Sequence, residues 1–142
     1  MAQAPLRNQP LLTPPELRAR LPEFYRALGQ FNDGYYFESH DTLEELWRVT
    51  PLPERLLFQS VIQLAAALVH FCRGKYPGII YLLDASADKL REFAPEHFGV
   101  DVARLLADVE RARDEFAALG EERFLEWDAA GVPRIDFIRT VE

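Results

Sequence analysis

The sequence predicts an all-α protein, a compact bundle of five or six mostly antiparallel helices. Apolar residues recur at intervals of three and four along most of the chain, which is the spacing of one face of an α-helix. Groups of glycine and proline separate these periodic segments and leave only short connections between them. No segment alternates apolar and polar residues in the way a half-buried strand does.

Length and composition fit a single globular domain. The 142 residues are 49% hydrophobic and 27% charged, and a chain of this length can bury a sizeable core without metal or disulfide support. We expect residues 1–12 to be disordered and residues 13–142 to form one helical domain. With 16 Lys and Arg against 23 Asp and Glu, the net charge is −7. The sequence has no cluster of basic residues of the kind that binds along the phosphate backbone of a nucleic acid. We therefore expect no nucleic-acid partner.

The first predicted helix begins at residues 13–16, where the sequence TPPE has the spacing of a capping box with proline in the first turn. The ring of Pro22 would clash with the carbonyl four residues back, so we expect a short helix over 14–20 and a second over 22–32. Gly34 then provides a left-handed stop. The next helix is expected over 35–49.

The most apolar helix is expected from Arg55 to Arg73, after a rigid TPLP turn at residues 50–53. It is shorter than the ~20 apolar residues that a bilayer requires and it contains polar side chains, so we expect a buried central helix and no membrane association. Cys72 lies in this apolar helix, which favours a buried and inert thiol. Because the segment MAQAPLRNQP has no apolar h-region, we expect a cytoplasmic protein.

Two more helices complete the predicted bundle, over residues 79–93 and 101–119. Asp101 is placed to cap the second of them and Gly120 to end it, with a connection over residues 95–100. The residues that follow are too apolar for a free tail. They are expected to lie across the bundle or on a neighbouring subunit.

A line of polar side chains crosses the predicted core. At 100° per residue, His40 falls in the same sector of its helix as Tyr36, Leu43 and Trp47, and Glu44 follows one turn later. On the 55–73 helix, the polar residues share one narrow stripe that ends in histidine. The candidate polar cluster consists of His40, Glu44, Trp47, Arg55, Gln59, Gln63 and His70.

One helix therefore carries histidine, acidic residues and tryptophan at a fixed spacing, and the next is rich in glutamine and alanine and ends in histidine. The residues of this pattern are Phe31, Asn32, Gly34, Tyr36, His40, Asp41, Leu43, Glu44, Trp47, Arg55, Gln63, Leu64, Ala65, Ala66, His70, Gly74 and Gly78. The pattern resembles the family known as domain of unknown function 309, over residues 22–95. The resemblance implies a compact helical bundle that tends to self-associate, and no established activity, substrate or cofactor. The sequence departs from the family pattern at Asp41, Lys75 and Ile79, where the family usually has Glu, Asn and Ala.

Two interpretations of the cluster remain open. In the first, it is a buried hydrogen-bond network in which Glu44 accepts from His40 or Arg55, while the glutamines and His70 pair with nearby groups. The protein is then a non-enzymatic scaffold or interaction domain. We expect it to be a homo-oligomer, held together by apolar surface such as residues 128–142.

In the second interpretation, His40, Glu44 and His70 hold a divalent metal in a small hydrolase, or line a pocket for a small ligand. The spacing differs from the HExxH of zinc proteases, so the sequence commits to no cofactor. Both interpretations require the imidazoles of His40 and His70 to face each other from two touching helices. The sequence assigns no catalytic residue and no substrate.

Overall fold

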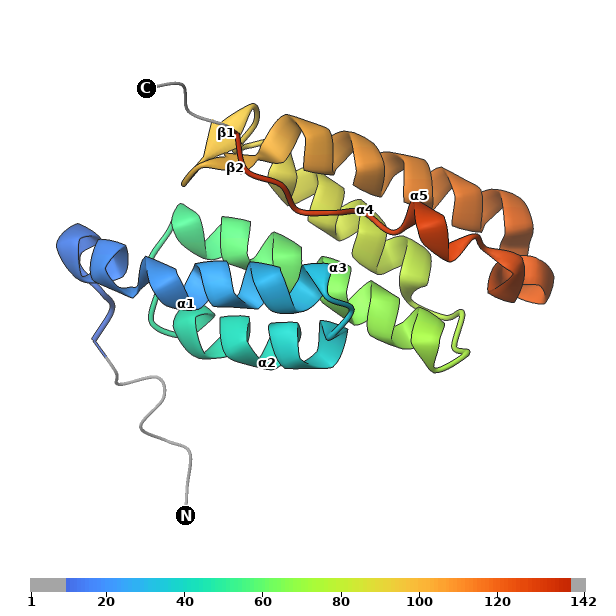
Figure 1. The fold of residues 1–142 in the computed structure, drawn as a ribbon, viewed down its shortest axis with the longest axis horizontal. Coiled ribbons are helices and arrows are strands. Elements are labelled where there is room, and N and C mark those ends of the chain that lie inside the picture. The colour runs from blue at the N-terminus through green and yellow to red at the C-terminus, as the bar shows by residue number, and fades with distance from the viewer. Residues whose placement is uncertain (1–9, 139–142) are drawn as a thin grey trace, which may run out of the picture.

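The computed structural model describes residues 10–138, and within them the predicted all-α class is confirmed. The hairpin strands β1 and β2 lie between α4 and α5, and two short 3-10 helices, η2 and η3, follow α5 (Figure 1). The α-helices are α1 (Pro14–Asn32), α2 (Tyr36–Trp47), α3 (Glu54–Cys72), α4 (Ile79–Leu90) and α5 (Val102–Arg123). The remaining elements are β1 (Glu96–His97), β2 (Val100–Asp101), η2 (Phe124–Glu126) and η3 (Ala129–Gly131).

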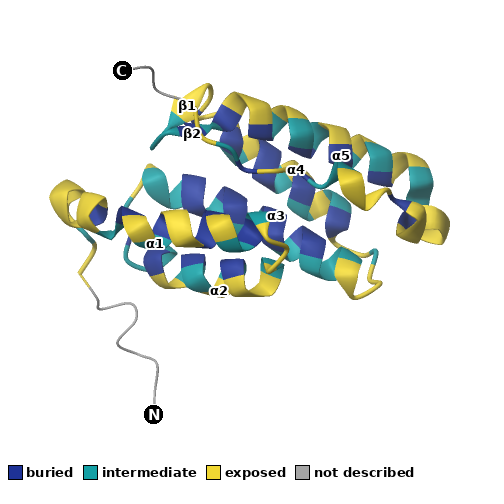
Figure 2. Cartoon of the chain, viewed as in Figure 1, coloured by how far each residue is buried: buried dark blue, intermediate teal, exposed yellow. Residues whose placement is uncertain are grey.

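Each helix packs most extensively against its neighbours in sequence, so the chain runs up and down through the bundle. The central helix is α3, which packs against α2 on one side and α4 on the other. Buried residues line the facing sides of the helices, while exposed residues lie on the outside (Figure 2). By length and composition α3 is apolar enough to cross a membrane, and half of its most apolar window is buried inside the bundle.

The first helix begins as predicted and continues further than predicted. The Thr13 hydroxyl accepts from the Glu16 N–H at 3.3 Å, and the Glu16 carboxylate accepts from the Thr13 N–H at 2.8 Å. The expected break at Pro22 is wrong, because α1 is one helix that passes through this exposed proline. Figure 1 shows the first turns of α1 at an angle to the rest, and a bend of this kind relieves the clash of a proline ring with the preceding turn.

Glycines and a short hairpin define the other chain reversals. Gly34 has φ +89° after α1, as predicted. Gly120 was expected to end the last helix, but it interrupts α5 with φ +72° and the helix continues to Arg123. The Asp101 side chain accepts from the Arg104 N–H and caps α5, also as predicted. The hairpin was not predicted, because each of its strands has only two residues and so shows no alternation.

The C-terminal segment lies across its own bundle. Trp127 is 6% exposed and Ile135 is 1% exposed. The backbone of Ile135 exchanges two hydrogen bonds, of 2.8 and 2.9 Å, with the side chain of Asn32 at the end of α1. Phe137 forms an antiparallel bridge with Val100, which extends the hairpin. Residues 1–9 of the expected disordered N-terminus, and residues 139–142, lie outside the described part of the chain.

Candidate functional site

The candidate cluster is carried by α2 and α3, which pack against each other. The buried side of α2 consists of Ser39, Leu43 and Leu46, and the Ser39 hydroxyl donates to the backbone oxygen of Ala27 on α1 at 2.8 Å. His40 is on the adjoining side of α2, which faces α3, and 28% of its side chain is exposed. The buried face of α2 is therefore turned about the helix axis from the predicted one, which was centred on Tyr36, Leu43 and Trp47. As a result, the side of α2 that carries His40 meets α3.

Trp47 and Arg55 join the two helices near the end of α2. The guanidinium carbon of Arg55 lies 4.1 Å from the centroid of the Trp47 ring, within the range of a cation–π contact. Glu44 does not accept from Arg55 or His40 as the hydrogen-bond network required. Its carboxylate instead lies 3.5 Å from the Arg48 guanidinium, one turn along the same helix. Within residues 10–138, Arg55 forms no ion pair with a carboxylate.

His40 and His70 line the same hollow between α2 and α3. This α2–α3 hollow has a volume of about 130 Å³ and is formed by Phe37, His40, Ala66, Val69, His70 and Arg73. Nδ1 of His70 lies 3.1 Å from the backbone oxygen of Pro77. Because a carbonyl oxygen can only accept, Nδ1 carries the proton and Nε2 is the free nitrogen of this ring.

Buried polar atoms without partners mark the contact between the two helices. Among the residues that the structure describes, His40 Nδ1, Trp47 Nε1 and Gln63 Oε1 are buried and form no hydrogen bond. A fourth such atom, Gln30 Oε1, lies on α1. Buried polar groups are paired in the great majority of cases, and each one left unpaired costs about 1–3 kcal/mol. The expected network between these side chains is therefore not formed within the described chain.

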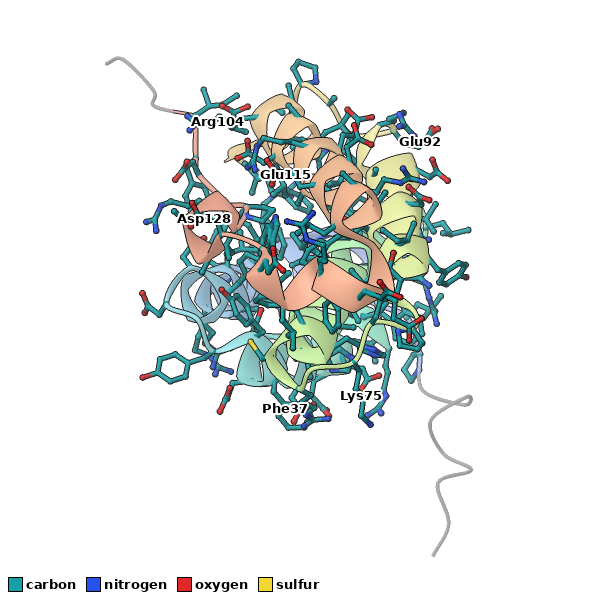
Figure 3. The ribbon with its side chains drawn as sticks, turned by 90° about the vertical axis from the view of Figure 1, so that its right-hand side faces the viewer. Phe37, Lys75, Glu92, Arg104, Glu115 and Asp128 are labelled. Carbon is teal, nitrogen blue, oxygen red and sulfur yellow. The ribbon has the colours of Figure 1, made fainter. Side chains whose placement is uncertain are left out.

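The α2–α3 face comprises the side chains Phe37, His40, Trp47, Arg55, Gln63, His70 and Arg73. Its two sides differ in charge. The charged residues of α2 are Glu38, Asp41, Glu44 and Glu45, whereas α3 and the loop after it contribute Arg55, Arg73 and Lys75 to this side. Figure 3 shows Phe37 and Lys75 together at the lower edge of the molecule, far from Glu92 and Arg104.

A possible metal-ligand group lies beside the hollow, with a different composition from the one expected. The ligand atoms of His40, Asp41 and Glu44 all lie within 4.8 Å of one another, whereas His70 is not part of this group. Asp41 was not part of the ligand set predicted from the sequence. Its position one residue after His40 was the only signal that it could join a ligand set.

Cys72, at the end of α3, is exposed, so the expectation of a buried thiol is wrong. Burial is the main cause that raises the pKa of the Tyr36 phenol above its ordinary value, and the charge of the Cys72 thiolate raises it further. The thiol therefore lies beside the beginning of α2. Phe37 and Arg73 were not in the predicted cluster, although Arg73 continues the polar stripe of α3.

Comparison with known proteins identifies the part of the chain that holds these residues. Residues 24–82 match the family model described as Domain of unknown function (DUF309). No curated protein and no solved structure matches the chain. The matched residues include α2, α3 and the whole α2–α3 face.

Proposed function

We propose that the protein self-associates and that the α2–α3 face binds a second copy. Residues 24–82 match the domain of unknown function 309 family, as the resemblance predicted. The description of this family names no activity, so the proposal rests on the geometry of the chain. The observation that carries this proposal is the exposed aromatic surface of the α2–α3 face, where Phe37 is 50% exposed and the Arg73 guanidinium lies over its ring.

The side chains of the α2–α3 face are those that contribute most to protein interfaces. Phe37 is 50% exposed on α2, and the ring of Trp47 is half-buried under Arg55. Arg73 lies 5.7 Å over the ring of Phe37. Aromatic residues and arginine are enriched among the residues that dominate binding energy, so this surface is suited to a protein partner.

The acidic residues of α2 and the basic residues Arg55, Arg73 and Lys75 on the other side of the face favour a second copy as that partner. A twofold axis presents the same surface on both subunits, so residues of α2 can meet residues of α3 in each direction. The acidic side chains of α2, such as Glu38 and Asp41, would then face basic side chains such as Arg73, which follows α3. Complementary charge of this kind orients association and excludes other partners.

The C-terminal segment is less suited to this role than we expected from the sequence. Trp127 and Ile135 are buried in their own bundle, so removal of residues 128–142 would open the core rather than only dissociate an oligomer. Phe137 and Ile138 of this segment are exposed, at 49% and 43%, but further apolar surface lies outside it. Phe37, on the α2–α3 face, is part of it.

Sedimentation equilibrium of the full chain tests the proposal. We expect the wild type to self-associate and Phe37→Glu to weaken the association about tenfold or more, equivalent to about 1.4 kcal/mol. Tyr81→Glu is the matched control, because Tyr81 is 71% exposed on α4 and lies outside the α2–α3 face. A monomeric wild type at all concentrations, or equal effects of the two substitutions, would reject this interface.

A metal-binding protein, such as a small metal-dependent hydrolase, is the second candidate. It is favoured by the close approach of ligand atoms from His40, Asp41 and Glu44, in place of the expected set with His70. One imidazole and two carboxylates can hold zinc or iron with positions open for water. Elemental analysis of untagged protein and calorimetric titration with Zn²⁺ test this candidate. Binding should be lost in a folded His40→Ala variant and retained in His70→Ala, and the absence of any binding would reject it.

A further inference from the structure

The α2–α3 hollow contains a positive charge without a partner in an otherwise acidic protein. Within residues 10–138, no carboxylate forms an ion pair with Arg73, whose guanidinium lies 5.7 Å from the centroid of the Phe37 ring. The chain as a whole has a net charge of −7. The side chains of His40 and His70 line the same hollow and add two imidazole rings to its wall.

The remaining walls of the hollow are apolar. Ala66 and Val69 form one side, and the Phe37 ring lies nearly parallel to the His40 imidazole, with an angle of 6° between the planes and 6.5 Å between the centroids. The volume of about 130 Å³ is equivalent to the space of about four water molecules in the liquid. A small planar group fits these dimensions, whereas a helix does not.

The ring of His70 is held in a fixed orientation at the edge of the hollow. Its Nδ1–H donates to the backbone oxygen of Pro77, in the loop that follows α3. A Cβ added to Gly78 would lie 3.5 Å from Cε1 of the ring, so the loop also packs against the imidazole. Nε2, the other ring nitrogen, is therefore left for a ligand.

We propose that the α2–α3 hollow binds a small molecule with a carboxylate on a planar apolar body. The carboxylate pairs with the Arg73 guanidinium, because charge-assisted hydrogen bonds to guanidinium are strong, and it lies beside the His70 ring. The apolar body lies against Phe37 and Val69. His40 is less suited to the carboxylate, because its Nδ1 already lies 3.6 Å from the carboxylate of Asp41.

All of these residues belong to one copy of the chain, so the inference does not require self-association. The test uses benzoate as the probe and benzamide as its uncharged match. Both are titrated into the full-length protein while NMR follows the Cε1–H signals of His40 and His70. We expect saturable shifts with benzoate and at least tenfold weaker binding of benzamide.

Variants identify the group that binds the carboxylate. Arg73→Gln should weaken benzoate binding about tenfold or more, whereas Lys75→Gln should change it less than twofold. Lys75 is an exposed cation at the same edge of the molecule but does not line the hollow. Equal binding of benzoate and benzamide, equal effects of the two variants, or no saturable shift would overturn the proposal.

The carboxylate could also come from an acidic side chain of a second copy. Sedimentation with and without benzoate distinguishes the two sources. If benzoate dissociates an oligomer, the second copy supplies the carboxylate in the absence of ligand. If benzoate binds without changing the mass, the hollow is a site for a free ligand. A monomeric protein that binds benzoate would reject the self-association proposal and support this one.

Discussion

The contact between Arg55 and Trp47 should contribute about 1 kcal/mol to the free energy of unfolding. Cation–π contacts contribute about 0.5–1 kcal/mol at exposed sites and about 2 kcal/mol when they are desolvated. The guanidinium carbon lies 4.1 Å from the ring centroid and both side chains are half-buried, so we expect an intermediate value. Arg55 has no carboxylate partner within residues 10–138, so ion pairing does not add to this coupling.

A double-mutant cycle isolates this contribution from packing. Arg55→Leu retains an apolar side chain against the bundle, and Trp47→Leu removes the ring. The indole N–H of Trp47 has no partner within the described chain, so its loss leaves no acceptor unsatisfied there. Urea denaturation of the wild type, both single variants and the double variant should give a coupling of about 1 kcal/mol. Each curve is measured at several protein concentrations, because self-association would make stability concentration-dependent.

Arg73 and Phe37 provide the matched comparison for this cycle. Their separation is 5.7 Å, both side chains are exposed, and phenylalanine is a weaker cation–π acceptor than tryptophan. We expect the corresponding cycle to give a coupling of about 0.5 kcal/mol or less. A coupling below about 0.3 kcal/mol for Arg55 and Trp47, or equal values for the two pairs, would refute the reasoning from distance and burial.

Three further predictions concern stability. Ser39→Ala removes the buried hydrogen bond from α2 to α1 and should lower the free energy of unfolding by about 1 kcal/mol in urea denaturation. The loss is limited because the acceptor is a carbonyl inside α1 that retains its helical donor. A cost above about 2 kcal/mol would contradict this reasoning. Gly34→Ala should cost about 1–2 kcal/mol because of its φ of +89°, whereas Gly29→Ala, in the interior of α1 with no atom within 4 Å of the new Cβ, should gain about 0.5 kcal/mol. The pKa of Glu23 is lowered mainly by the hydrogen bond from Arg20. The resulting stabilisation is present above the unfolded-state pKa and is lost as pH falls through the folded-state pKa, so Glu23→Gln should destabilise by less than about 1 kcal/mol at neutral pH and not in strong acid.

The helices could be predicted from the sequence because periodicity and capping are local. The helix expected over 55–73 is found at Glu54–Cys72, and Thr13 and Asp101 cap their helices as predicted. The continuity of α1 could not be predicted in this way. Leu17, Leu21 and Phe24 lie on one buried face on both sides of Pro22, so tertiary packing maintains a helix that local propensity would interrupt.

Cys72 shows a second limit of periodicity. The pattern of α3 indicates which side a residue faces, but not how far the neighbouring helices extend. Cys72 is the last residue of α3, and the bundle ends there, beside the beginning of α2 at Tyr36. A residue at the end of an apolar stripe can therefore be exposed even when every earlier residue of that stripe is buried.

The arrangement of the candidate site depends on which of two arginines, Arg48 or Arg55, pairs with Glu44. Arg48 is four residues later on the same helix, and a glutamate that precedes a basic residue by four is the favoured orientation of such a pair. Pairing with Arg55 would instead require a particular distance between α2 and α3, which no local pattern specifies. Because Glu44 lies near Arg48, Arg55 is free to lie over Trp47, and His40 Nδ1 has no hydrogen-bond partner in the described chain. One short-range preference at the end of α2 thus leaves the expected closed network unformed, and polar atoms of His40, Trp47 and Gln63 stay buried without partners in the described chain.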